Sequence, residues 1–262
     1  RNIGYLKDCL DNKSLTMIET GDSGKFRDYL FERGLSSSSV KRMFSSIRAI
    51  VGLAIKKNGI EITNPFVGTF IPDDQNRKRR LPVPGDVLTE LQRICFNMDD
   101  EPRWLIALLS DTGMRLAEAV GLLSDDINLD NCNPHIKLQE HPWRSLKTRS
   151  SIREVPLVGA SLWAAEQIKN NGNYFAFPEY CTKAKCNSNS ASAALNKWLK
   201  SRVPDGCVVH SFRHSLRDRL REVECPSDVV DAIGGWSTEG VGQGYGKGYG
   251  LDVRMRWMQK IV

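Results

Sequence analysis

The stretch Thr112-Gly-Met-Arg-Leu-Ala-Glu-Ala-Val-Gly-Leu122 carries the most information about this chain. Its Thr-Gly pair predicts a tight turn into a helix, on which Arg115 and Glu118 stand three residues apart and share one face. The simpler interpretation is a surface ion pair of little energetic weight. The alternative is that Glu118 holds the guanidinium while its other donors grip a phosphate in a bidentate manner.

A second stretch, His210-Ser-Phe-Arg213-His214, repeats this spacing far along the chain. His210 and Arg213 are again three residues apart, and His214 follows one helical turn after His210. The chain has only 4 histidines, and two of them lie here. Taken alone, His210 is most simply a structural histidine. Beside a second arginine stretch, a shared anion-binding site becomes the favoured interpretation.

The length and composition favour a globular protein of two domains. The 262 residues are long for one compact core. The hydrophobic share of 40% and the charged share of 26% are those of a soluble protein. No apolar run approaches the ~20 residues that span a bilayer. The chain opens Arg1-Asn-Ile-Gly4, with neither a methionine nor an apolar signal core, so we expect a trimmed chain and no secretion.

Basic residues are unevenly distributed. The net charge of +6 favours a polyanionic partner only mildly. Residues 36–60, however, contain no acidic residue and five basic ones, which are Lys41, Arg42, Arg48, Lys56 and Lys57. A second basic block, Asn76-Arg-Lys-Arg-Arg80, follows. The simpler interpretation of the first block is the solvated face of an ordinary amphipathic helix.

The 7 cysteines are odd in number and scattered, which favours a reducing cytoplasm over a secreted disulfide framework. Cys181 and Cys186 form the only close pair, and no further pair of cysteines or histidines lies near enough to complete a zinc site. No metal is therefore predicted.

Hydrophobic periodicity predicts a mainly α protein with a small antiparallel β-sheet, an α+β fold. The clearest helix follows the N-cap candidates Ser36–Ser39, has an apolar stripe from Val40 to Ile55 and stops at Asn58-Gly59. Further helices are predicted at 25–33, at 87–94, at 104–109, near 161, near 190 and at 251–262. Short strands are predicted at 136–138 and 152–157.

Eight glycines crowd between Gly234 and Gly250. Neither G-x-G-x-x-G nor G-x-x-x-x-G-K-[ST] occurs among them, so a dinucleotide or ATP cofactor is not expected. Glycine leaves the backbone unconstrained, and the segment carries two tyrosines, Tyr245 and Tyr249.

In this order and spacing, the stretches resemble the tyrosine recombinase family, also called phage-type integrases. Thr-Gly-Met-Arg-Leu-x-Glu resembles the first arginine box of that family, and His210-x-x-Arg213 resembles its second. Trp236 lies where the family has His or Trp, and Tyr245 follows at the spacing of the family nucleophile. Lys147 matches the lysine on the family's β-hairpin turn. Residues 26–66 resemble its core-binding domain.

The resemblance implies a domain organisation. Residues 1–72 would form a helical core-binding domain that binds DNA, 73–84 a basic linker, and 85–262 a tyrosine-recombinase catalytic domain with a C-terminal tail. That tail would either pack in cis or dock on a neighbouring protomer. Both basic blocks would contact DNA through Lys41, Arg42, Arg48, Arg77, Lys78, Arg79 and Arg80.

The resemblance also implies the roles of the site residues. Two arginines would neutralise the charge on a scissile phosphate, with the indole N–H as a further donor. A tyrosine would attack and form a 3′-phosphotyrosyl link. A histidine would act as base or hydrogen-bond donor, and a lysine would protonate the 5′ oxygen as general acid. The catalytic set is then Arg115, Lys147, His210, Arg213, Trp236 and Tyr245.

Two residues would support this set, and one choice stays open. Glu118 would orient Arg115, and His214 would support the same cluster. Spacing favours Tyr245 over Tyr249 as the nucleophile. Because the covalent link conserves the energy of the broken bond, no cofactor is needed. No carboxylate cluster for two metal ions is apparent either.

The resemblance implies a site-specific DNA recombinase or integrase of a phage or other mobile element. It would bind double-stranded DNA as a homotetramer on paired sites, and would be a monomer or weak oligomer without DNA. It would act in the bacterial cytoplasm, at the nucleoid when bound to DNA, and would have no membrane partner. The alternatives are an enzyme like the type IB topoisomerases, which act as monomers, and a non-catalytic DNA-binding regulator of the same fold.

Overall fold

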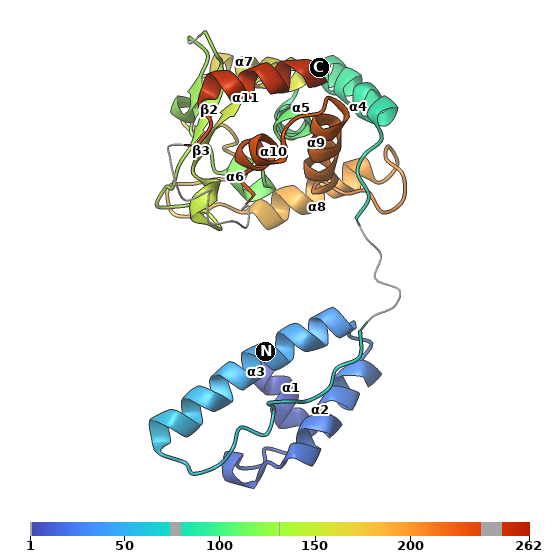
Figure 1. Ribbon diagram of the computed structural model, residues 1–262, viewed down its shortest axis with the longest axis vertical. Helices are drawn as coiled ribbons and strands as arrows, with labels where there is room; N and C mark the ends of the chain where they lie inside the picture. Colours follow the sequence, from blue (N-terminus) through green and yellow to red (C-terminus); the bar gives the residue numbers. More distant parts are fainter. Residues whose placement is uncertain (1, 74–79, 131, 237–247) are drawn as a thin grey trace. The chain divides into compact units, whose positions relative to one another are not determined.

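The computed structural model of the chain describes residues 2–73, 80–130, 132–236 and 248–262 (Figure 1). The chain divides into two compact units, Arg1–Lys78 and Arg79–Val262, and this division falls within the predicted linker. Each unit has its own hydrophobic core. Among the described residues, no helix is both long and apolar enough to cross a membrane.

The first unit is helical. Its elements are α1 (Asn2–Cys9), the 3-10 turn η1 (Leu15–Met17), α2 (Thr20–Glu32) and α3 (Ser37–Asn58). The helix predicted after the serine run is confirmed as α3. Ser36 caps it by accepting a hydrogen bond from the Ser39 amide at 3.4 Å. Gly59 ends it with φ of 60°, a left-handed conformation that glycine adopts without strain.

Three phenylalanines form the centre of this first core. Phe26 of α2, Phe44 of α3 and Phe66 have no exposed surface. Their ring centroids lie 5.5 to 6.3 Å apart, two of the three pairs edge to face, which is a favourable arrangement for aromatic quadrupoles. The loop that carries Phe66 is tied to α3, because the Asn64 amide donates to the Arg48 carbonyl at 3.0 Å.

The second unit is built around a buried helix, α5 (Glu101–Thr112). Every residue of α5 from Leu105 to Thr112 is buried, as expected for the apolar run at 104–109. It packs against α4 (Gly85–Met98), α7 (Gly159–Asn170), α9 (Ser211–Glu222) and α6 (Leu116–Val120). The remaining long helix of this unit is α8 (Ser188–Leu199), which packs on α6.

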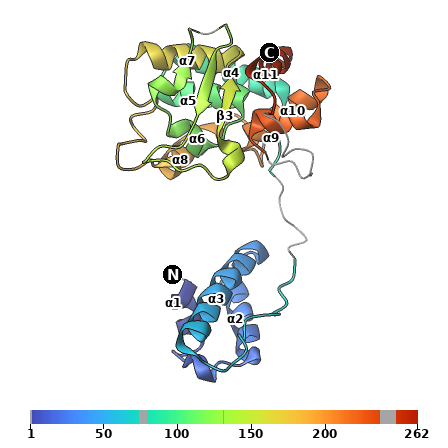
Figure 2. The ribbon, with the colours of Figure 1, turned by 60° about the vertical axis from the view of Figure 1, so that its left-hand side comes forward.

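A small sheet flanks these helices (Figure 2). It contains β1 (Ile127–Asn128), β2 (His135–Leu138) and β3 (Arg153–Pro156), antiparallel and in that order. Short 3-10 turns precede two of the strands, η2 (Ser124–Asp126) before β1 and η3 (Arg149–Ser151) before β3. The predicted α+β class and both predicted strands are confirmed.

The chain ends in α10 (Ser227–Gly234), α11 (Leu251–Met258) and the turn η5 (Gln259–Ile261). In Figure 1, α10 lies beside α9, and it also contacts β3 and α11. Met255 and Met258 of α11 are buried in a cluster with Leu216 and Ile233. The C-terminal tail therefore packs in cis on its own unit.

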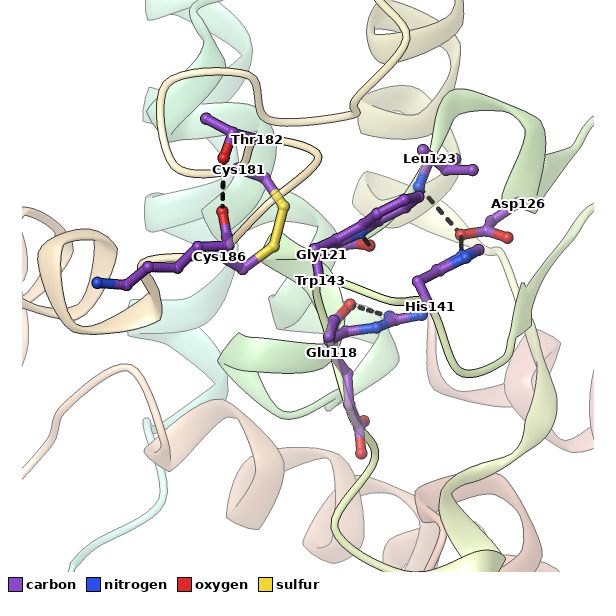
Figure 3. Close-up of a disulfide and its surroundings, with 11 residues drawn as sticks. Glu118, Gly121, Leu123, Asp126, His141, Trp143, Cys181, Thr182 and Cys186 are labelled. Atoms are coloured by element: carbon purple, nitrogen blue, oxygen red, sulfur yellow. Dashed lines mark hydrogen bonds and ion pairs between the residues drawn. A yellow bond between two sulfur atoms is a disulfide. The ribbon is translucent and has the colours of Figure 1, made fainter.

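One local disulfide joins Cys181 to Cys186 (Figure 3). Between them, Thr182 and Lys185 exchange backbone hydrogen bonds at 2.9 and 3.2 Å, so the bridge closes a tight turn. The sequence analysis weighed this pair only as half of a zinc site, which it rejected, and it did not predict a disulfide. Spacing alone does not show that the intervening residues turn.

The first core gives a direct test. Phe44→Ala should lower the free energy of unfolding of the first unit by about 3–5 kcal/mol, through lost burial and a residual cavity. Phe70→Ala is the matched control, because Phe70 is 74% exposed, and should change it by less than about 0.5 kcal/mol. All 6 tryptophans lie in the second unit. In Phe44→Ala, the denaturant midpoint of the first unit, followed by circular dichroism, should therefore fall. The midpoint followed by tryptophan fluorescence should stay unchanged.

Candidate active site

The Thr-Gly turn predicted before Arg115 is present, and it sets the spacing of two helices. Gly113 ends α5 with φ of 55°. A Cβ on this glycine would lie 2.6 Å from Leu216 of α9, so the absence of a side chain allows α5 and α9 to approach. Arg115 then stands in extended conformation as the N-cap of α6.

Arg115 and Glu118 form a partly buried pair rather than a surface ion pair. The Arg115 guanidinium donates to Glu118 Oε1 at 2.5 Å, and the Arg115 amide donates to Oε2 at 3.0 Å. Glu118 is only 3% exposed. Burial by itself would raise the pKa of Glu118, but Arg153 and Arg115 hold that pKa below its usual value. Glu118 is therefore ionised and fixes Arg115.

Arg213 is buried without a carboxylate partner. It donates to the carbonyl of Gly113 at 2.8 Å and to that of Gly234 at 2.6 Å. Among the described residues, no carboxylate lies within ion-pair distance of its guanidinium. Burial, followed by the charges of Arg115 and Arg153, lowers its pKa to about 9, so it stays protonated at neutral pH.

The C-terminal end of α10 brings the arginines together. The last carbonyls of a helix lack partners within the helix and carry its negative dipole end. Here the carbonyls of Ile233, Gly234 and Gly235 accept hydrogen bonds from Arg153 at 2.9 Å, Arg213 at 2.6 Å and Arg115 at 3.4 Å, respectively. Because these carbonyls are successive, three guanidinium groups converge on one helix end.

Trp236 follows this helix end directly. Its amide donates to the Asp231 carbonyl at 3.0 Å, as in a glycine-terminated helix cap. Its ring lies against two guanidinium groups of α9, with the Arg213 carbon 4.3 Å and the Arg217 carbon 4.9 Å from the ring centre. Trp236 thus joins the cluster around Arg213.

His210 and His214 lie at the start of α9, with exposed side chains and ring centroids 5.5 Å apart. Although its ring is partly accessible, desolvation by its neighbours and then the charges of Arg80, His214, Arg213 and Arg115 lower the pKa of His210 to about 4. His210 is therefore neutral at physiological pH. A phosphate anion beside it would act in the opposite direction.

Lys147 lies exposed in the loop between β2 and β3, as the hairpin prediction requires. The base of this loop is fixed to the end of α6 (Figure 3). Trp143 donates to the Gly121 carbonyl at 3.2 Å, and Arg144 donates to the Glu118 carbonyl at 2.7 Å. His141 contacts Asp126 at 2.8 Å.

The other end of the same loop, just before β3, connects to Arg115 through Ser151. Ser151 is fully buried, and its hydroxyl accepts a hydrogen bond from the Arg115 guanidinium at 3.0 Å. The hydroxyl of Thr148, next to Lys147, lies 3.1 Å from it. The loop is therefore tied to the end of α6 near its start and to Arg115 at its end before β3.

Tyr245 lies outside the described residues, as do Arg77, Lys78 and Arg79. Tyr249 is described, and its hydroxyl donates to Asp228 at the N-terminal end of α10. That hydrogen bond raises the pKa of Tyr249, which disfavours its phenolate. Tyr249 is thus engaged at the end of α10 opposite to the arginine cluster.

The predicted DNA-contact residues of the first unit lie on α3. Arg42 is exposed, whereas Lys41 forms an ion pair with Asp73, and the partly buried Arg48 donates to the Phe44 carbonyl at 3.4 Å. In the second unit, Arg80 is exposed.

The sequence analysis missed Arg153, Ser151 and Gly235. The sequence did contain a signal for Arg153. In the strand from Arg153 to Pro156, this arginine shares the buried face with Val155. An arginine on the buried face of a strand is unusual and implies a buried partner. No comparable signal marks Ser151.

Comparison with known proteins assigns the chain to a family. The model of the phage integrase family matches residues 86–247, which include both arginine stretches and Trp236. The chain belongs to the phage integrase family. This confirms the resemblance inferred from the motifs.

Two curated integrase relatives are tyrosine recombinases XerC. The protein from Chromobacterium violaceum is 30% identical over 133 residues, covering 50% of this chain and 44% of the relative. The protein from Vibrio cholerae is 24% identical over 196 residues, covering 72% of this chain and 60% of the relative. The matched region thus spans about half the length of these relatives.

Solved integrase structures share the fold at lower identity. The Tn1549 transposon integrase in complex with transposon right end DNA matches with a TM-score of 0.67 and 18% identity, covering 98% of this chain and 87% of that one. A lambda integrase tetramer bound to a Holliday junction matches with a TM-score of 0.69 and 16% identity, covering 93% and 68%.

No group of three or more His, Cys, Asp or Glu residues within the described ranges could hold a metal ion. The arginine cluster itself offers hydrogen-bond donors and positive charge directed at an anion.

The close approach at Gly235 can be tested by substitution. Gly235 has φ of 63°, and a Cβ there would lie 2.6 Å from the Arg153 guanidinium. Gly172 has φ of 69° with nothing within 4 Å, so Gly172→Ala should show only the strain of the left-handed backbone, about 1–2 kcal/mol. Gly235→Ala should lower the free energy of unfolding clearly more than Gly172→Ala does, as measured by denaturant titration followed by tryptophan fluorescence. Equal losses would show that the approach to Arg153 is relaxed easily.

The lowered pKa of His210 predicts a pH-dependent stability. Because its folded pKa of about 4 is below the ordinary value of 6.5, the unfolded chain takes up the proton first as pH falls. The folded state therefore loses stability as the pH falls from 6.5 towards 4, and His210 has no such effect above pH 6.5. His210→Asn should lose less stability than wild type on going from pH 7.5 to pH 5, measured by urea titration. An identical loss in both proteins would contradict the shift.

Proposed function

We propose that this phage integrase family member is a site-specific tyrosine recombinase that cleaves and rejoins DNA through a 3′-phosphotyrosyl intermediate. The observation that carries the proposal is the convergence of Arg115, Arg153 and Arg213 on the end of α10. Within the described part of the chain, only one carboxylate, Glu118, pairs with them. This excess positive charge suits a phosphodiester. The end of α10, where the arginines meet, comes shortly before Tyr245 in the sequence.

In this proposal the phosphate is held by Arg115 and Arg213. Attack on phosphorus adds negative charge to the non-bridging oxygens, and donors already in position stabilise that charge most effectively. Glu118 prepares Arg115 by fixing two of its N–H groups. Trp236 supplies an indole N–H near Arg213 as a further donor.

Proton transfers are assigned to the exposed groups. Tyr245 attacks phosphorus, its phenolic proton passes to neutral His210, and the bond from phosphorus to the 5′ oxygen breaks. Lys147 gives a proton to that leaving oxygen. Rejoining reverses these steps with a new 5′-hydroxyl. His214 supports His210 from the next turn of α9.

The engagement of Tyr249 supports Tyr245 as the nucleophile. The Tyr249 hydroxyl is held by Asp228, and a helix of this length separates it from the arginine cluster by about 12 Å. The same hydrogen bond raises the pKa of Tyr249 and so disfavours its phenolate, the form that would attack. Tyr245 follows Trp236 at the family spacing.

The first unit would serve as the DNA-binding core-binding domain. Its exposed basic side chains and the basic block at 77–80 would contact DNA phosphates, so that both domains would contribute to DNA binding. Lys41 would first have to release Asp73, so Arg42 is the more available contact. By analogy with the lambda integrase tetramer on a Holliday junction, we expect four protomers on paired DNA sites. The likeness to the Tn1549 transposon integrase supports a mobile element. We further propose that the protein acts in a bacterial cytoplasm.

A trapping experiment tests this function. Duplexes that bind the full chain would be selected from a randomised library and rebuilt with a nick beside the scissile phosphate, so that the cleaved fragment diffuses away. Wild type should accumulate a covalent adduct. Tyr245→Phe should form none, and the matched control Tyr249→Phe should react like wild type. Mass spectrometry would identify the attached residue.

Other outcomes would assign other functions. If the wild-type protein binds DNA but forms no adduct, a DNA-binding regulator is indicated. If it forms an adduct and relaxes supercoiled DNA as a monomer, without joining paired sites, an activity like that of type IB topoisomerases is indicated. If the adduct maps to Tyr249, the nucleophile assignment is wrong.

A further inference from the structure

Arg153 is a deeply buried charged group beside the site. It opens β3, and its side chain is 4% exposed. Its three nitrogens donate to partners on three separate elements: Nε to the Ile233 carbonyl of α10 at 2.9 Å, Nη1 to the Ser151 carbonyl of η3 at 3.0 Å, and Nη2 to Glu118 of α6 at 3.3 Å.

We infer that Arg153 is a positioning residue of the cleavage centre, which locks Glu118 onto Arg115 and holds the end of α10 from which Trp236 and the Tyr245 segment continue. The inference rests on the proposed function. Each nitrogen of Arg153 already donates to a group of the protein, so we assign it to act through the groups that it holds.

The first argument is that Arg153 is a costly way to fill this position. A buried guanidinium loses its hydration, and replacing buried charges by apolar side chains is often neutral or stabilising. Val155, two residues along on the same strand face, shows that an apolar side chain suits this face. The position of Arg153 is therefore better explained by what it holds than by stability.

The second argument is that the backbone of α10 is shaped around this guanidinium. Gly235 takes φ of 63°, and a Cβ there would lie 2.6 Å from Arg153 Nη1 and 3.0 Å from the Ser150 carbonyl. The chain can pass this close only because residue 235 has no side chain. The same residue offers its carbonyl to Arg115 at 3.4 Å, so a shift of Arg153 would also move an acceptor of Arg115.

The third argument concerns the charge of Glu118. The charged groups that face it are Arg115 of its own helix, Arg153 of β3, Arg213 of α9 and Arg144, which donates to its backbone carbonyl. Arg153 is the leading influence that lowers the pKa of Glu118 against the effect of burial. Without that charge, Glu118 would take up a proton at a higher pH and would release Arg115.

Two substitutions separate these roles. Arg153→Met removes both charge and hydrogen bonds, whereas Arg153→Lys keeps the charge but cannot reach three partners in one plane. Arg219→Met is the matched control. Arg219 also pairs with a buried carboxylate, Asp111 at 2.9 Å, but contacts none of Arg115, Glu118 or Arg213. Single-turnover cleavage of the selected nicked duplex would be followed at saturating protein from pH 5.5 to 9.

We expect Arg153→Met to cleave about 100-fold more slowly at the optimal pH, because small misplacements of reacting groups cost that much. Its rate should also begin to fall at a higher pH than that of wild type on the acid side. Arg153→Lys should be slow but keep the wild-type acid limb. Arg219→Met should lose thermal stability and keep the wild-type pH profile. Wild-type rates and profiles in both Arg153 variants would overturn the inference.

A measurement without DNA separates this inference from the proposed function. Hydrogen exchange of the amides of Gly235 and Trp236, both of which donate to the Asp231 carbonyl, reports on the end of α10. These amides should exchange faster in both Arg153 variants than in Arg219→Met at equal margins below their melting temperatures. If wild type forms no adduct, the proposed function fails whatever this measurement shows. If adducts form but exchange is unchanged, only the role of Arg153 fails. Should Arg153→Met not fold, Arg153→Lys decides alone.

Discussion

The structure of the second unit depends on one set of hydrogen bonds, in which buried arginine donors meet the carbonyl acceptors at a helix end. A helix that ends in the protein interior leaves carbonyls in need of donors, and buried arginines need acceptors. At the end of α10 both needs are met together, because Arg115, Arg153 and Arg213 donate to its free carbonyls. Because these arginines come from α6, β3 and α9, the single helix end fixes the relative positions of three elements that lie far apart in sequence.

This arrangement leaves positive charge in excess. Glu118 is the only carboxylate that pairs with these three arginines among the described residues. The lowered pKa values of Arg213 and His210 have a common origin in burial and neighbouring arginines. An anion bound beside the arginine cluster would offset the mutual repulsion of these positive charges. Under the proposed function, binding of a phosphodiester would draw on electrostatic energy that the fold stores, as in preorganised catalysis.

The sequence predicted what local signals determine. The cap at Ser36, the stop at Gly59, the turn at Gly113 and the pairing of Arg115 with Glu118 all arise within a few residues. The family motifs then indicated the site as a set. What the sequence did not show depends on distant contacts: the inward face of Arg153 has meaning only because α10 ends opposite β3. The disulfide depends on the turn between its two cysteines, which spacing alone does not define.

The site divides its chemistry between enclosed and exposed groups. The groups that would hold charge, Arg115, Arg213 and Glu118, are anchored by several hydrogen bonds each, because stabilisation of developing charge needs donors that do not reorganise. The groups that would move protons, Lys147 and His210, are exposed. A proton donor must reach a leaving oxygen that belongs to the substrate, so it cannot be buried beforehand. Anchoring the Lys147 loop at its base and at Ser151 reconciles the two needs, since the backbone is fixed while the lysine side chain remains free to reach the DNA.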